Sequence, residues 1–128
     1  MSFITIEGFE SLTQQQLFDM SAKHIIAQGK PGQSDFGSCS YKAGCAASIF
    51  IKPDQHSYAD DLGSWEDLEI HGKVPETNSY FVENLQLCHD RAALESYRNG
   101  GDGFIADWAA RMRDIASTYT LNTDALTA

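Results

Sequence analysis

Basic residues are scarce in this chain. Nine lysines and arginines stand against eighteen aspartates and glutamates, which leaves a formal net charge of -9 over 128 residues. Direct binding to a phosphate backbone needs a lysine or arginine surface, and a few scattered basic residues do not form one. We therefore expect no direct contact with nucleic acid. The excess of acids favours a partner with a basic surface, because opposite charges steer the encounter of two proteins.

The sequence also lacks a run of about twenty apolar residues, the length needed to cross a bilayer. Its first residues, MSFITIEGFESL, show no basic segment followed by an apolar stretch, as a secretory signal would. Cysteine is rare: Cys39, Cys45 and Cys88 form an odd set that argues against a disulfide scaffold. We expect no membrane span, a cytoplasmic location with reduced thiols and, at this length, one domain over residues 1–128.

Helical signals are present in three parts of the chain. Thr13 and Gln16 have the spacing of a capping box, and Gly29 can end a helix, so a helix is predicted from about Gln14 to Gln28. A second helix is predicted to open at residue 77 or 78. A third opens near residue 102, and residues 121–128 after it are expected to fray. The third carries apolar side chains at helical spacing: Ile105, Trp108, Met112, Ile115 and Tyr119.

The stretch CSYKAGCAASIFI predicts a β-hairpin. Its two halves, SCSY and CAASIFI, are joined by KAG, and Gly44 can take the positive φ that closes such a loop. A short strand is also possible around Ile4 and Ile6. The predicted fold is therefore α+β, with about three main helices packed on a small antiparallel sheet centred on the hairpin.

Four segments, taken together, resemble a known group of proteins. They are LFDMSAKHIIAQG, CSY followed by GCAASIFI, LQLCHD, and the final helix through IASTYTL. In this order they are similar to a widespread group of short proteins encoded by phages, prophages and mobile elements, over roughly residues 16 to 120. The resemblance implies a phage-type accessory protein and a mostly helical fold around one hairpin. No activity is established for that group, so no functional residue is carried over from it.

Acidic residues gather between Lys52 and Lys73, where helix and strand signals are weakest. Binding residues are common on loops that a rigid scaffold positions. Trp65 lies among these acids and could anchor an interface with a charged rim, or it could be buried and fix the segment to the core. Replacing the acids by amides is expected to leave the melting temperature within a few degrees. The predicted partner-binding residues are Asp60, Asp61, Trp65, Glu66, Asp67 and Glu69.

The leading functional hypothesis is a non-enzymatic accessory protein that binds and modulates a host protein through this acidic surface. A host defence component is one version of the partner, and mimicry of nucleic-acid charge is one version of the mechanism. The oligomeric state is left open.

The alternative is a thiol-dependent hydrolase or small-ligand-binding enzyme centred on Cys45, with His71 or His56 as base and Asp61 or Asp60 orienting it. Cys45 begins a predicted strand and lacks the helix N-terminus that would lower its pKa, so catalysis is the less favoured reading.

No cofactor is predicted. No metal site is predicted either, because five residues separate Cys39 from Cys45 and a zinc knuckle needs closer thiolates. The other reading of these cysteines is as small buried apolar side chains. The CHD triplet at residues 88–90 is not expected to act as a catalytic trio, because neighbours on a helix point in different directions.

Overall fold

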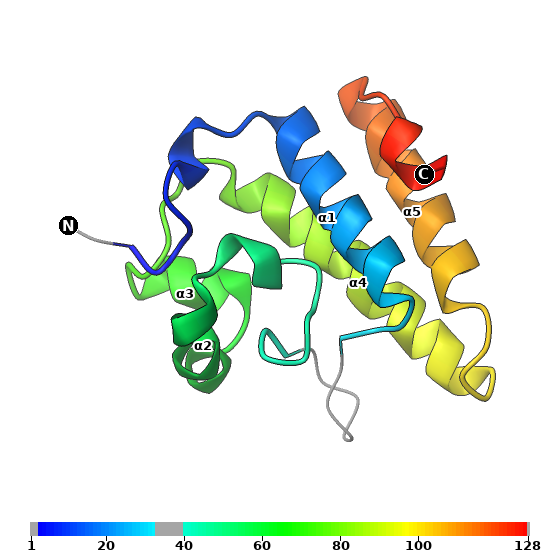
Figure 1. The fold of residues 1–128 in the computed structure, drawn as a ribbon, viewed down its shortest axis with the longest axis horizontal. Helices are drawn as coiled ribbons and strands as arrows, with labels where there is room; N and C mark the ends of the chain where they lie inside the picture. Colours follow the sequence, from blue (N-terminus) through cyan, green and yellow to red (C-terminus); the bar gives the residue numbers. More distant parts are fainter. Residues whose placement is uncertain (1–2, 33–39, 128) are drawn as a thin grey trace.

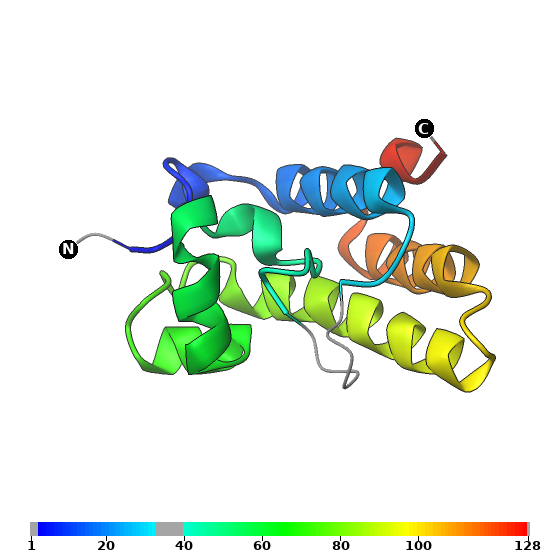
Figure 2. The same ribbon diagram turned by 60° about the horizontal axis from the view of Figure 1, so that its bottom comes forward.

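The structure is a computed structural model that describes residues 3–32 and 40–127. Within these ranges three long helices lie side by side, and two short helices sit near the end of the group where α4 begins (Figures 1 and 2). The helices are α1 (Gln14–Gln28), α2 (His56–Leu62), α3 (Trp65–Ile70), α4 (Ser79–Arg98) and α5 (Phe104–Tyr119). Short 3-10 turns are η1 (Phe9–Ser11), η2 (Ser48–Phe50), η3 (Pro53–Gln55) and η4 (Asp124–Thr127).

The predicted bounds of α1 are confirmed, and local side chains explain them. The Thr13 hydroxyl accepts a hydrogen bond from the Gln16 amide at 3.1 Å, and the Gln16 side chain accepts one from the Thr13 amide at 2.9 Å. These two bonds satisfy amides that the first helical turn leaves without partners. At the other end Gly29 takes a left-handed φ of 72°, which stops the helix.

The long helices pack through their apolar faces. Helices α4 and α5 form an antiparallel pair, and α1 lies against α4 (Figure 1). Trp108 and Met112 of α5 are fully buried. Ile105, Ile115 and Tyr119 are partly buried and pack against the same core, so the predicted apolar face of α5 is confirmed.

The predicted antiparallel sheet is wrong. Over the described residues the only β pairing is a single antiparallel bridge between Thr5 and Ile51. Residues 41–44 form a turn in which Gly44 does take a positive φ, of 95°. The expected return strand is instead a turn followed by the 3-10 turn η2, so the fold is helical. Cys39, the first cysteine of the predicted hairpin, lies outside the described residues.

The expected strand fails to pair because side chains take the place of a β ladder. Residues 44–51, the core segment, pass between α1 and α4 with most of their residues fully buried (Figure 2). The His24 ring nitrogen Nε2 donates to the Gly44 carbonyl at 2.8 Å, and the Ser21 hydroxyl donates to the Ala46 carbonyl at 3.2 Å. The Ala47 amide donates to the Gln86 side-chain oxygen at 2.9 Å.

Side chains also supply hydrogen-bond partners for backbone carbonyls at the end of the core segment. His56 Nε2 lies 2.9 Å from the Ser48 carbonyl oxygen and 3.1 Å from that of Ile51, so it donates to both. The Ser48 hydroxyl bonds back to the Cys45 carbonyl at 2.6 Å, a local contact that favours a tight turn over an extended chain. Buried backbone groups need partners, and here side chains of α1, α2, α4 and the core segment itself supply them.

The C-terminal residues are docked, contrary to the expected fraying. Gln15 of α1 donates to the Asn122 carbonyl at 3.0 Å and accepts from the Asn122 amide at 2.8 Å. Ala125 and Leu126 of η4 are buried against α1. The segment therefore covers part of the α1 surface.

Helix α2 was not predicted. Its sequence, HSYADDL, buries only Ala59 and so shows no apolar period. Over residues 3–32 and 40–127, none of the helices combines the length and the apolar character that crossing a membrane requires.

We expect replacement of Gln86 by leucine to destabilise the fold. The substitution keeps most of the side-chain volume but leaves the buried Ala47 amide without its acceptor, which costs about 1–3 kcal/mol of unfolding free energy. Urea unfolding measures the loss. Arg91→Leu, on an exposed turn of the same helix, should change the free energy by no more than about 0.5 kcal/mol. Equal effects of the two substitutions would contradict the role given to Gln86.

Candidate functional site

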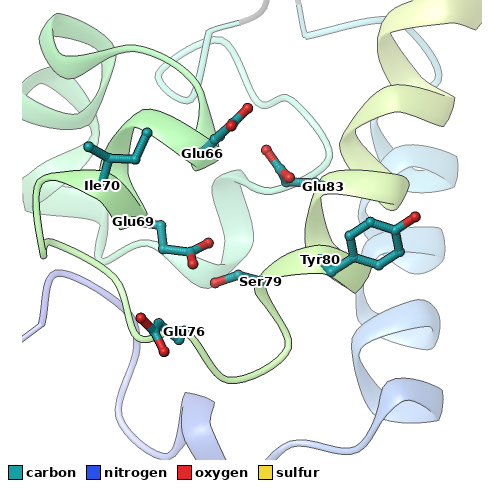
Figure 3. Close-up of a pocket in the computed structure, with 7 residues that line it drawn as sticks. All are labelled: Glu66, Glu69, Ile70, Glu76, Ser79, Tyr80 and Glu83. Atoms are coloured by element: carbon teal, nitrogen blue, oxygen red, sulfur yellow. The ribbon is translucent and has the colours of Figure 1, made fainter.

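An open groove between α3 and the first turns of α4 collects acidic side chains (Figure 3). Its volume is about 470 Å³. Among the residues that the structure describes, four glutamates line this acidic groove, and the carboxylates of Glu66, Glu69 and Glu83 turn into the space between the two helices (Figure 3). The described lining residues are Glu66, Glu69, Ile70, Glu76, Ser79, Tyr80 and Glu83.

The carboxylates of the acidic groove repel one another. Partial burial raises the pKa of Glu83 above its ordinary value, and the nearby charges of Glu66, Glu69 and Asp67 raise it further. Among the described lining residues none is a lysine or arginine, so no basic group of the wall offsets this repulsion. The groove thus favours the approach of a positive charge.

Two apolar side chains flank these acids. Ile70, the last residue of α3, is 72% exposed, and Tyr80, near the start of α4, is 73% exposed. The Tyr80 ring points away from the carboxylates (Figure 3). Large apolar side chains next to a charged depression are typical of a protein interface, where an apolar contact is surrounded by polar groups.

Only two of the six predicted partner-binding residues, Glu66 and Glu69, line the acidic groove. Asp61 is exposed on α2, apart from it. Asp67 accepts a hydrogen bond from the Ser64 amide at 3.0 Å and so caps α3. Trp65 is buried against Phe9, with ring centroids 5.6 Å apart, so it fixes α3 to the core and cannot serve as an exposed anchor.

Asp60 has a structural role that its exposed neighbour Asp61 lacks. One carboxylate oxygen of Asp60 accepts from the Tyr41 amide at 2.6 Å. The other accepts from the Ser40 hydroxyl at 3.0 Å and from the Lys42 amide at 3.2 Å. Asp60 therefore holds the 41–44 turn against α2.

Four residues of the groove were not predicted as parts of one site: Ile70, Glu76, Tyr80 and Glu83. A signal was present in the predicted second helix, since Tyr80 and Glu83 lie off the apolar face that carries Phe81, Leu85 and Cys88. The sequence could not show that α3 packs beside this part of α4.

The alternative thiol site is not assembled. Cys45 is fully buried in the core, whereas His71 and Asp61 are exposed, and no hydrogen bond joins the Cys45 thiol to either of them. A substrate cannot reach a nucleophile in that position. Burial raises the pKa of Cys88 to about 11, so this thiol stays protonated at neutral pH.

Two neighbouring residues of the CHD triplet are in contact, although side chains of neighbours on a helix were expected to point in different directions. His89 Nδ1 lies 3.0 Å from an Asp90 carboxylate oxygen. The Gly32 amide donates to His89 Nε2 at 2.8 Å, so the proton of the neutral ring lies on Nδ1 and is donated to Asp90. Both ring nitrogens are thus engaged, and His89 ties the chain at Gly32 to α4. A side chain at position 32 would collide with the Gly44–Cys45 peptide, which explains glycine there.

Metal binding finds no support among the described residues, where no three histidine, cysteine, aspartate or glutamate side chains are placed to share an ion. Comparison with protein-family models, with curated proteins and with solved structures gives no match to this chain.

We expect Asp60→Asn and Asp61→Asn to separate structural from solvated acids. The amide at position 60 would place N–H groups against the donors of the 41–44 turn, at a cost of about 1–3 kcal/mol. The same change at exposed position 61 should cost less than about 0.5 kcal/mol. Thermal and urea unfolding of both variants measure the difference. The sequence predicted that amides could replace these acids with little change in melting temperature, and the contacts of Asp60 revise that prediction. Equal melting temperatures of the two variants would contradict the structural role given to Asp60.

Glu83→Gln is expected to stabilise the protein at neutral pH. Because the folded-state pKa of Glu83 is raised, the free energy of unfolding falls as the pH rises from the ordinary value of 4.5 through the raised pKa, and the loss is complete above it. The variant should melt about one to three degrees higher at pH 7. The gain should shrink as the pH falls toward the ordinary value of 4.5, where the wild-type group is itself becoming neutral. Melting curves between pH 4 and 8 test this, with exposed Glu10→Gln as control. A gain that does not depend on pH would contradict the repulsion.

Proposed function

We propose that this protein is a non-enzymatic binding protein whose acidic groove receives a basic segment of a partner protein. The observation that carries the proposal is the convergence of glutamates from α3, α4 and the chain between them on one groove with exposed Ile70 and Tyr80 beside it. A lysine or arginine placed among these carboxylates would relieve the repulsion that raises the pKa of Glu83. The apolar neighbours would add contact area that charge alone does not supply.

Two further observations favour binding over catalysis. Cys45 is in the core, and His24, His56 and His89 bond to backbone groups of buried chain, so His71 is the one exposed histidine of the described residues. None of the described residues that line the groove carries an imidazole or a thiol. This arrangement favours recognition of a charge.

The similarity of several sequence segments to short phage and prophage proteins is in keeping with an accessory role in a host cell. On this proposal the partner is a host protein with a basic surface. Spaced carboxylates can occupy a site built for phosphates, so a host protein that handles nucleic acid, a defence component among them, is one form of such a partner.

Binding of a decalysine peptide tests the groove. We expect chemical-shift changes in ¹⁵N-labelled protein to concentrate on residues 66–83 and to weaken strongly between about 50 mM and 500 mM salt. A groove variant, with Glu66, Glu69, Glu76 and Glu83 changed to glutamine, should bind at least about tenfold more weakly.

The matched control changes the same number of acids outside the groove, at Glu10, Asp54, Asp102 and Asp114, to their amides. Both variants then carry the same net charge, so a general charge effect would weaken binding equally in both. Equal affinities would count decisively against the groove as the binding site. Circular dichroism and melting curves of each variant establish that the fold is retained.

A further inference from the structure

A line of exposed apolar side chains runs along the outer face of α4. Tyr80, Leu87 and Leu94 are spaced seven residues apart, and Tyr97 follows three residues later. Leu87 is 44% exposed, Leu94 is 46% exposed and Tyr97 is 76% exposed, so each offers surface that the fold does not cover. Residues seven apart lie on nearly the same side of a helix, and α4, with 20 residues, is about 30 Å long. We refer to these four residues as the α4 stripe.

The core does not require the α4 stripe. The opposite side of α4 supplies the buried residues, among them Phe81, Leu85 and Ala92, and this side faces the other helices. Single exposed apolar residues are ordinary in proteins, but a row at heptad spacing matches the pattern by which one helix packs along another.

We infer that the α4 stripe docks an amphipathic helix of a basic partner, which lies along α4 and places its positive end in the acidic groove. This inference rests on the proposed function and names the form of the partner segment. Tyr80 belongs both to the α4 stripe and to the groove lining, so the two surfaces are continuous. A helix presenting apolar residues every three or four positions would contact the α4 stripe on one side.

Charge gives the docked helix its direction. The N-terminal half of α4 is flanked by Glu76, Glu83 and the groove. Its C-terminal half carries exposed Arg91 and Arg98, of which Arg98 is paired with Glu95 at 3.0 Å. The lysines and arginines of the partner helix therefore lie at the end nearest Tyr80, and its other end is neutral or acidic. A second copy of this chain fits less well, because both copies carry a net charge of -9 and repel at long range.

A pair of peptides tests the inference on the full-length protein. The first is a three-heptad helical peptide with leucine at the first and fourth positions and lysines confined to one terminal heptad. The second has the same composition and the same terminal lysines, with its leucines redistributed around the helix. Fluorescence anisotropy gives both affinities, and sedimentation gives the state of the protein alone. We expect wild type to bind the first peptide at least about tenfold more tightly than the second.

The stripe variant Leu87→Gln/Leu94→Gln should lose this preference and bind both peptides alike. The control Tyr58→Gln, which alters an exposed aromatic residue on α2, should retain it. Both changed leucines are half exposed, so the variant is expected to fold, and circular dichroism verifies this.

Three outcomes would overturn the inference or its basis. If the stripe variant still prefers the first peptide, the helix does not dock on the α4 stripe, whatever the groove does. If wild type sediments as a dimer that the stripe variant abolishes, the stripe is a contact between copies of this chain. If the groove variant keeps the wild-type affinity for both peptides at low and high salt, the proposed function fails. The difference in affinity between the two peptides would still show whether a helix docks on the α4 stripe.

Discussion

The structure depends on one constraint: the backbone of a buried, irregular segment must find hydrogen-bond partners inside a helical protein. Residues 44–51 lie between α1 and α4, where water does not satisfy their amides and carbonyls. Side chains from three helices do so instead, through Ser21 and His24 of α1, His56 of α2 and Gln86 of α4. Each of these contacts connects a helix to the same short segment. The relative placement of α1, α2 and α4 therefore follows from the polar partners as well as from apolar packing.

The same constraint accounts for the contacts of several polar residues whose types are common in catalytic sites. His24 and His56 bond to carbonyls of the core segment, whereas His71, the predicted base, is exposed. His89 spans from Gly32 to Asp90, and Asp60 holds the turn at residues 41–44. A buried polar group left without a partner is costly, so polar residues in a small core are most often partners of the backbone. The glutamates of the acidic groove have no such structural contact among those described above.

These glutamates have a different physical character. Glu66, Glu69, Glu76 and Glu83 line a groove in which partial burial and, after it, neighbouring carboxylates raise the pKa of Glu83. On the proposed function, a cationic side chain of the partner would offset the repulsion among these carboxylates. The exposed apolar row on α4 begins at the same place, so charge and apolar contact are available to a single partner segment. Charge would steer the encounter, and burial of Leu87 and Leu94 would supply affinity that salt does not screen.

The sequence by itself determined the helices whose signals are local. The capping box of Thr13 and Gln16, the stop at Gly29 and the apolar spacing on α5 act over a few residues, and the structure confirms them. The sheet was wrong because CAASIFI is apolar on both sides, and such a run is compatible with a strand or with any other buried chain. Only the tertiary structure decided between them, by bringing Gln86 and His24 to the core segment from distant helices. The candidate site divides in the same manner. Composition alone showed that the chain is acidic. Only the packing of α3 against α4 showed that Glu66 and Glu69 line a groove with Glu83, whereas Asp60 and Asp67 do not.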